Sequence, residues 1–159
     1  MVKTIFIGDV QAGNYDGQEV ELMGWVKRSR GSNKIRFIVL RDSTGVIQCV
    51  VKRDAVGDDS FEDAKGALIE SSIIITGMIN VDERADGGHE MVATSVAIVG
   101  SVNPEKPFPI TESAMQAADG GETEFLLDNR HLYLRTSRMT TMLQVRSTVF
   151  GAIHNYFRD

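Results

Sequence analysis

The feature that most constrains the fold is a series of three strand-like segments between residues 19 and 54. Residues 19–31 begin with alternating apolar and polar side chains, and residues 34–42 and 45–54 are rich in β-branched residues. The sequence STG separates the last two segments, and its glycine suits a tight hairpin turn. We therefore predict that these segments form a meander of three strands.

A short helix is predicted after the meander, over residues 58–70. Phe61, Ala64 and Leu68 recur there at helical spacing. Asp59 is a possible N-cap, because a glutamate follows it three residues later in the pattern of a capping box.

Two further strands, over residues 71–84 and 89–100, flank the turn-forming sequence ADGG. The predicted order is thus three strands, a helix and two strands. This order is typical of an OB-fold, an all-β, five-stranded Greek-key barrel that commonly binds oligonucleotides on the face centred on its second and third strands. Other small barrels fit the same order.

The sequence changes in character after residue 102. All three prolines, Pro104, Pro107 and Pro109, fall within six positions, and proline removes a backbone donor and blocks a helix from continuing. We predict a barrel domain over residues 1–102 and a linker over residues 103–124 that contains a helical turn and a glycine-rich loop.

The remaining region, residues 125–159, is predicted to be mainly helical. One helical stripe is apolar and consists of Met142, Val145, Val149, Ile153 and Phe157. Such a helix needs a partner that covers its apolar face. The chain ends at YFRD without a capping glycine or a further strand, so we expect this region to be the start of a longer domain.

Positive charge is concentrated in one part of the chain. The whole chain has a net charge of −5, but residues 27–53 hold eight basic side chains against a single acid, Asp42, for a local net charge of +7. Such a cluster is either a solvated surface or a binding surface for a polyanion. The acidic remainder would repel non-specific polyanions.

Side-chain alternation divides the second and third strands into two faces. One set is wholly apolar, and we predict that it faces the core: Ile38, Leu40, Ile47, Cys49 and Val51. Phe37 and Gln48 then lie on the outer face, beside Arg28 and Arg30 of the first strand. A bulge in a curved strand would reverse this assignment, so the pattern alone leaves both facings open.

An outward aromatic ring, an amide and guanidinium groups together suit single-stranded RNA. A base that stacks on an aromatic ring contributes about 1–3 kcal/mol, whatever the base. A glutamine amide offers both a donor and an acceptor to the Watson–Crick edge of an unpaired base, and arginines hold the flanking phosphates.

The segments GWVKRSR, RFIVLRD and GVIQCVV resemble the anticodon-binding barrel of the class II aminoacyl-tRNA synthetases for asparagine, aspartate and lysine, and the resemblance covers residues 1–100. It implies that Phe37 stacks on an anticodon base and that Gln48 reads the central uridine. It also implies that Arg28 contacts the RNA backbone and that Glu90 helps to read an anticodon base.

The C-terminal region indicates which of these enzymes the chain resembles most. TEFLLDNRHLYLRT resembles the segment that leads into the catalytic domain of the asparagine enzymes, and MLQVRSTVFGAIHNYFRD resembles the start of their motif 1 helix. That helix forms a homodimer interface in the family, which implies such a role for the apolar stripe. The aspartate enzymes remain an alternative, although they usually have DLR where this chain has YLR.

No catalytic residue is predicted in this chain. The family uses ATP and Mg²⁺ through motifs 2 and 3, which the sequence does not contain, so the resemblance implies these cofactors only for an intact ligase. The predicted partner is the anticodon loop of a tRNA. A stand-alone OB-type module that binds single-stranded nucleic acid is the alternative from a different class of function.

Other ligands and compartments are not indicated. His89, His131 and His154 lack metal-ligand spacing, and Cys49 is the single cysteine, so no metal site or intrachain disulfide is predicted. The N-terminus lacks a signal-peptide pattern, and the longest apolar runs are too short to cross a bilayer. We therefore expect a cytoplasmic protein without a membrane partner.

Overall fold

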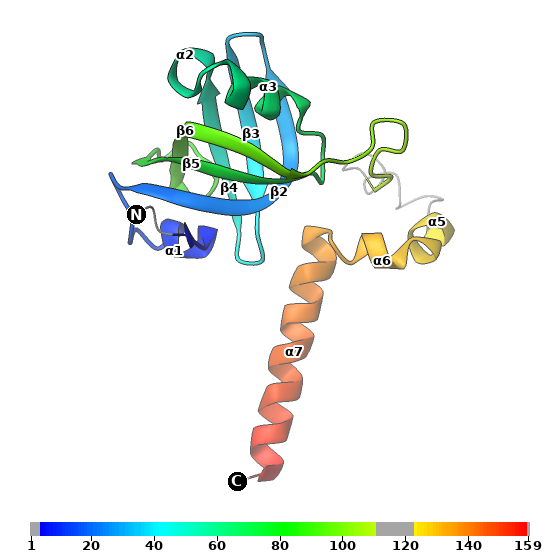
Figure 1. Ribbon diagram of the computed structural model, residues 1–159. Helices are drawn as coiled ribbons and strands as arrows, with labels where there is room; N and C mark the ends of the chain where they lie inside the picture. Colours follow the sequence, from blue (N-terminus) through cyan, green and yellow to red (C-terminus); the bar gives the residue numbers. More distant parts are fainter. Residues whose placement is uncertain (1–3, 111–122, 159) are drawn as a thin grey trace. The chain divides into compact units, whose positions relative to one another are not determined.

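The computed structural model describes residues 4–110 and 123–158. The chain divides into two compact units, residues 1–108 and residues 109–159. The first unit contains the strands, and the second contains the C-terminal helices (Figure 1). The glycine-rich loop predicted near residue 120 lies outside the described residues.

The first unit is a closed barrel, and the predicted OB-fold is confirmed. Consecutive strands pair as antiparallel neighbours from β2 to β4, β4 runs parallel to β6, and β6 returns antiparallel to β5. Pairing of β5 with β2 closes the barrel. The strands are β2 (Glu19–Gly31), β3 (Ile35–Arg41), β4 (Val46–Lys52), β5 (Ser72–Val81) and β6 (His89–Gly100).

Strand β2 pairs with β5 along its first half and with β3 along its second half, so it bends across the barrel. Gly24 lies at this bend. A Cβ atom there would lie 2.4 Å from the carbonyl oxygen of Arg41, so only glycine lets the two backbones approach this closely.

Helices α2 (Arg53–Val56) and α3 (Asp58–Gly66) lie between β4 and β5, and α3 buries Phe61 against the barrel core. The predicted cap is wrong. Gly57, with a φ of 80°, ends α2 and precedes α3, so Asp59 lies inside the first turn of α3. The helix also ends at Gly66, which leaves Leu68 exposed and buries Ala67 instead.

The sequence analysis did not predict the N-terminal elements. Strand β1 (Thr4–Ile5) pairs in parallel with β2, and helix α1 (Ile7–Gln11) buries Ile7 and Val10 in the core. The β3–β4 turn caps this helix, because the backbone N–H of Ile7 donates to Oδ2 of Asp42 at 2.7 Å. Asp42, the one acid in the basic region, therefore has a structural role.

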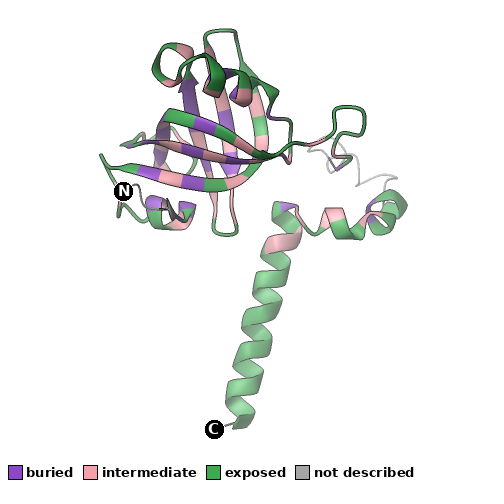
Figure 2. Ribbon diagram, viewed as in Figure 1, coloured by how far each residue is buried: buried purple, intermediate pink, exposed green. Residues whose placement is uncertain are grey.

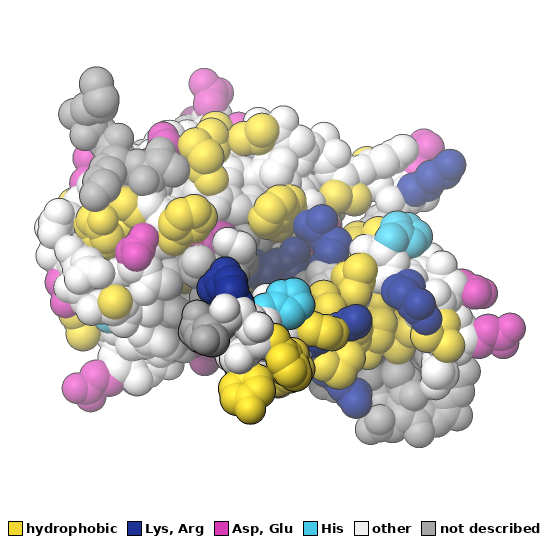
Figure 3. Space-filling model, turned by 90° about the horizontal axis from the view of Figure 1, so that it is seen from below, with side chains coloured by type: hydrophobic (Ala, Val, Ile, Leu, Met, Phe, Trp, Pro, Cys, Tyr) yellow, Lys and Arg dark blue, Asp and Glu magenta, His cyan; other side chains and the backbone are white. Residues whose placement is uncertain are grey.

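The second unit contains α5 (Thr123–Asp128), α6 (Arg130–Tyr133) and α7 (Ser137–Arg158). The helix predicted for the apolar stripe is present, but its stripe residues are between 45% and 81% exposed. Figure 2 shows α7 exposed along nearly its whole length. The space-filling view in Figure 3 shows that hydrophobic side chains reach the molecular surface on the side seen from below. None of the described helices is long and apolar enough to span a membrane.

Candidate nucleic-acid interface

The predicted facing of β3 and β4 is confirmed. All five apolar residues assigned to the core are at most 1% exposed: Ile38, Leu40, Ile47, Cys49 and Val51. Phe37 and Gln48 alternate with them and are half-buried on the outer face. A ligand in solvent can therefore reach both side chains, which lie on neighbouring strands.

The strand register places the candidate side chains in two adjacent rows on this outer face. Arg28 of β2 lies opposite Val39 of β3, which lies opposite Gln48 of β4, and Gln48 lies opposite Glu90 of β6. The next row begins with Arg30 opposite Phe37. Side chains directly opposite each other on one face are near neighbours. The structure therefore brings together all five predicted side chains.

A β-bulge in β2 sets the orientation of the two arginines. Val26 lies opposite Leu40, but Arg28 lies opposite Val39, so Lys27 is an extra residue without a register partner. Val26 is fully buried, and strict alternation would direct Arg28 and Arg30 into the core as well. Because of the bulge, both arginines share the outer face with Phe37.

These side chains line a groove of about 580 Å³. The wall beyond β6 is the β5–β6 loop, residues 82–88, which includes the short helix η1 (Asp86–Gly88). The sequence analysis assigned residues 82–84 to the end of a strand and only residues 85–88 to a turn, whereas β5 ends at Val81. It therefore missed Asp82, Arg84 and Asp86, which line the groove. The available signal was the charged sequence DERAD beside the turn glycines.

Charge in the groove is divided between its two sides. Arg28 and Arg30 come from β2, whereas the carboxylates of Asp82, Asp86 and Glu90 come from the β5–β6 side. Phosphates therefore fit the β2 side. Carboxylates accept hydrogen bonds from the amino and imino groups of bases, so the other side suits base edges.

The aromatic ring at the centre of the face already has a cationic neighbour. The Arg30 guanidinium lies over the Phe37 ring, with its Cζ atom 5.6 Å from the ring centroid. This is within the range of a cation–π contact. The structure thus places a positive charge next to the aromatic ring.

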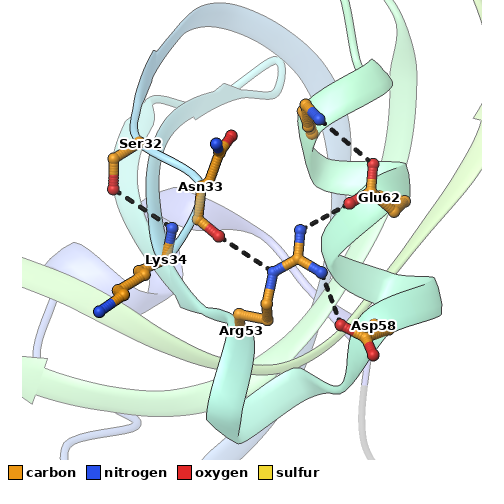
Figure 4. A network of polar contacts seen from close by, with 7 residues as sticks. Ser32, Asn33, Lys34, Arg53, Asp58 and Glu62 are labelled. Carbon is orange, nitrogen blue, oxygen red and sulfur yellow. Dashed lines mark hydrogen bonds and ion pairs between the residues drawn. The ribbon is translucent and has the colours of Figure 1, made fainter.

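Arg53 and Arg41 belong to the basic region of the sequence, but they do not serve this face. Arg53 donates to Asp58 and Glu62 of α3 at 2.6 Å each and to the backbone oxygen of Asn33 at 3.0 Å (Figure 4). Arg41 donates to both carboxylate oxygens of Glu70 at 3.0 Å. The local charge of +7 therefore overstates the charge offered to a ligand.

Cys49 lies in the core directly behind the groove. Burial, with a smaller contribution from the nearby Glu90 carboxylate, raises the pKa of the Cys49 thiol to about 12. The side chain therefore remains a neutral thiol at physiological pH and acts as a small apolar residue.

His89 has a structural contact pattern. Its ring nitrogens lie 2.9 Å from Oδ1 of Asp16 and 3.0 Å from the backbone oxygen of Gly87. The contact with Asp16 joins the loop before β2 to the start of β6. Within residues 4–110 and 123–158, no three His, Cys, Asp or Glu side chains are grouped as metal ligands.

A closed barrel with an aromatic ring, an amide and arginines in one surface groove defines an OB-fold nucleic-acid-binding module. The chain belongs to the tRNA anticodon-binding family of OB-fold nucleic-acid-binding domains, whose family model matches residues 20–99.

Most of the chain is also similar to part of the asparagine–tRNA ligases. It is 41% identical over 145 residues to that of Symbiobacterium thermophilum, which covers 91% of this chain and 31% of the relative. The Thermoplasma acidophilum ligase is 37% identical over 153 residues, covering 96% of this chain and 33% of the relative.

Among solved structures, the asparaginyl-tRNA synthetase of Pyrococcus horikoshii complexed with asparaginyl-adenylate matches with a TM-score of 0.82 and 34% identity. That match covers 98% of this chain and 34% of the other. The chain thus spans about a third of the length of these relatives.

Proposed function

We propose that this chain is the tRNA-anticodon-binding portion of an asparagine–tRNA ligase. The observation that carries the proposal is the set of two adjacent rows that places Arg28, Arg30, Phe37, Gln48 and Glu90 on one face of the barrel. The similarity to asparagine–tRNA ligases over most of the chain supports the choice of amino acid.

Each side chain has a distinct role in this proposal. Phe37 stacks on one unpaired anticodon base, and the Gln48 amide pairs with the edge of the central base. Glu90 accepts hydrogen bonds from a base that carries donors. Arg28 and Arg30 neutralise the phosphates on the β2 side of the groove.

The chemical step is assigned to the intact ligase. There, asparagine and ATP with Mg²⁺ would form an adenylate, from which asparagine is transferred to the tRNA. The described residues offer no grouped set of metal ligands, so none of them is given a part in that step. This chain would contribute the selection of the tRNA.

The same proposal gives α7 a partner and the protein a location. Homodimerisation of the intact ligase would cover the exposed stripe formed by Met142, Val145, Val149, Ile153 and Phe157. We place the protein in the cytoplasm, because tRNA is charged there and because cysteines such as the single one of this chain remain reduced there.

The stacking role is tested with an anticodon stem-loop at fixed salt concentration. Phe37→Ala should weaken binding by about 1–3 kcal/mol, because it removes one stacked base contact. Phe6→Ala is the matched control: its ring is 57% exposed and does not line the groove, so affinity should be unchanged. Equal affinities of the two variants would contradict the proposal.

The same assay separates the competing functions. The anticodons GUC and GCU each differ by one base from GUU, which belongs to asparagine. A preference for GUU supports the proposal, whereas a preference for GUC supports the aspartate alternative. A stand-alone module would bind all three alike, with an affinity set mainly by salt concentration.

A further inference from the structure

The β5–β6 loop presents an arginine whose edge is held by an acid. Arg84 donates from Nε to Oδ1 of Asp82 and from Nη2 to Oδ2, both at 3.0 Å. The side chain of Asp82 is only 21% exposed, whereas that of Arg84 is 90% exposed. The carboxylate therefore lies against the protein, and the guanidinium plane extends from it into solvent.

The pair remains charged over a wide pH range. Hydrogen bonds from the side chain and backbone of Arg84 lower the pKa of Asp82, and the hydrogen bond to Asp82 raises the pKa of Arg84. Two parallel charge-assisted hydrogen bonds fix the orientation of the guanidinium plane more firmly than one would.

The loop that carries the pair is itself well ordered by backbone contacts. The N–H of Asp82 donates to the oxygen of Gly88 at 3.0 Å, and the N–H of Ala85 donates to the oxygen of Asp82 at 2.9 Å. Gly87 packs directly on the side chain of Gln11. The Nε2 atom of Gln11 in turn donates a hydrogen bond to the backbone oxygen of Val46 in β4 at 2.9 Å. These contacts fix the β5–β6 loop to the barrel.

Arg84 belongs to the same groove as the predicted RNA-reading residues. It lines that groove together with Phe37 and Gln48. The charge of Glu90 also contributes to its raised pKa, so the two side chains lie within electrostatic reach of each other.

We propose that Arg84, held flat by Asp82, is a second stacking platform that receives the base next to the one stacked on Phe37. This inference rests on the proposed function, because it deepens the recognition of the anticodon loop. Guanidinium planes are established surfaces for unpaired bases. A phosphate is a poorer ligand here, since Asp82 neutralises Arg84 and the nearby Asp86 and Glu90 repel phosphate.

Two substitutions separate stacking from simple charge attraction in stem-loop binding by the full chain. Arg84→Lys keeps the charge but loses the plane, and we expect affinity to fall about tenfold. Asp82→Asn removes a negative charge but loosens the plane, and we expect affinity to fall about threefold. Pure charge attraction gives the opposite result for Asp82→Asn, since loss of a carboxylate then strengthens RNA binding.

The control is Glu83→Gln, a change of one charge in the same loop at an exposed residue that does not line the groove. It should leave affinity within twofold. Thermal unfolding of each variant checks that the barrel is intact.

Abasic substitution at successive anticodon positions locates the base. The effect of Arg84→Lys should vanish at one position and that of Phe37→Ala at its neighbour. Unchanged affinity of Arg84→Lys, or tighter binding by Asp82→Asn, overturns the second platform while leaving the proposed function in place. If Phe37→Ala instead binds the stem-loop that carries all its bases as tightly as the wild type does, the proposed function is overturned and the second platform with it.

Discussion

The barrel and helix α7 differ in what they do with their hydrophobic side chains. Ile38 and Leu40 of the barrel are fully buried, whereas Val149 and Phe157 of α7 are 52% and 81% exposed. Both segments have the apolar periodicity of their secondary structure. The difference teaches that periodicity fixes which face is apolar, but a second surface must be present before that face contributes to stability.

The largest expected difference between the barrel and α7 is in how fast a cysteine side chain reacts with an alkylating reagent. Cys49 is fully buried and its pKa is raised to about 12, so iodoacetamide should reach it only when the barrel opens. A cysteine placed on α7, as Val149→Cys in a Cys49→Ala background, should react at least about a thousandfold faster. Mass spectrometry measures both rates. Similar rates would show that the barrel opens as readily as the helix.

Side-chain truncation should show the next largest difference. Leu40→Ala should lower the free energy of unfolding by about 2–5 kcal/mol, because it leaves a cavity in the barrel core. Val149→Ala should change it by no more than about 0.5 kcal/mol, because that side chain is already in solvent.

Urea titration followed by the fluorescence of Trp25, the only tryptophan and a residue of β2, measures both values. A large effect of Val149→Ala would mean that α7 is covered in solution and that the two regions differ less than their exposure indicates.

The smallest expected difference between the two regions is in how acid pH changes their stability. The hydrogen bond from Arg53 lowers the pKa of Glu62 below its ordinary value of 4.5. Glu62 therefore stabilises the barrel at neutral pH, and this contribution is lost as the pH falls below 4.5 through the lowered value. Residues 129–158, which include α7, contain no acid and should show no such loss.

Thermal unfolding between pH 7 and pH 3 tests this effect with Glu62→Gln. The melting temperatures of the wild type and the variant should differ at neutral pH and converge in acid. A difference that stays constant over the whole range would rule out a contribution from the Glu62 carboxylate.

The order of the barrel elements and the facing of Phe37 and Gln48 could be predicted because both depend on local periodicity. Strands in which one face is wholly apolar, as in residues 35–52, have only one favourable orientation. The helix before β5 was predictable for the same reason, and it starts at Asp58 as predicted, but its cap and its end at Gly66 were not predictable. Gly57 at a φ of 80° overrides the capping preference of Asp59.

The parts that escaped prediction depend on contacts between distant segments. Helix α1 is only five residues long and is fixed by Asp42 and Thr44, which follow it by 35 and 36 positions. Arg84 and Asp82 reach the groove because β6 pairs with β4, which sequence spacing does not reveal. The extra residue at Lys27 likewise becomes visible only when β2 is aligned with β3.

That extra residue has a consequence for how this surface can evolve. Exchanging Arg28 or Arg30 for another polar residue alters one contact and leaves the neighbouring positions as they are. Deleting Lys27 would remove the bulge and place Arg28 directly after Val26, so that regular alternation would keep both guanidinium groups on the outer face. The recognition surface should therefore accept new side chains readily and keep its outward arginines through descent whether or not the extra residue is retained.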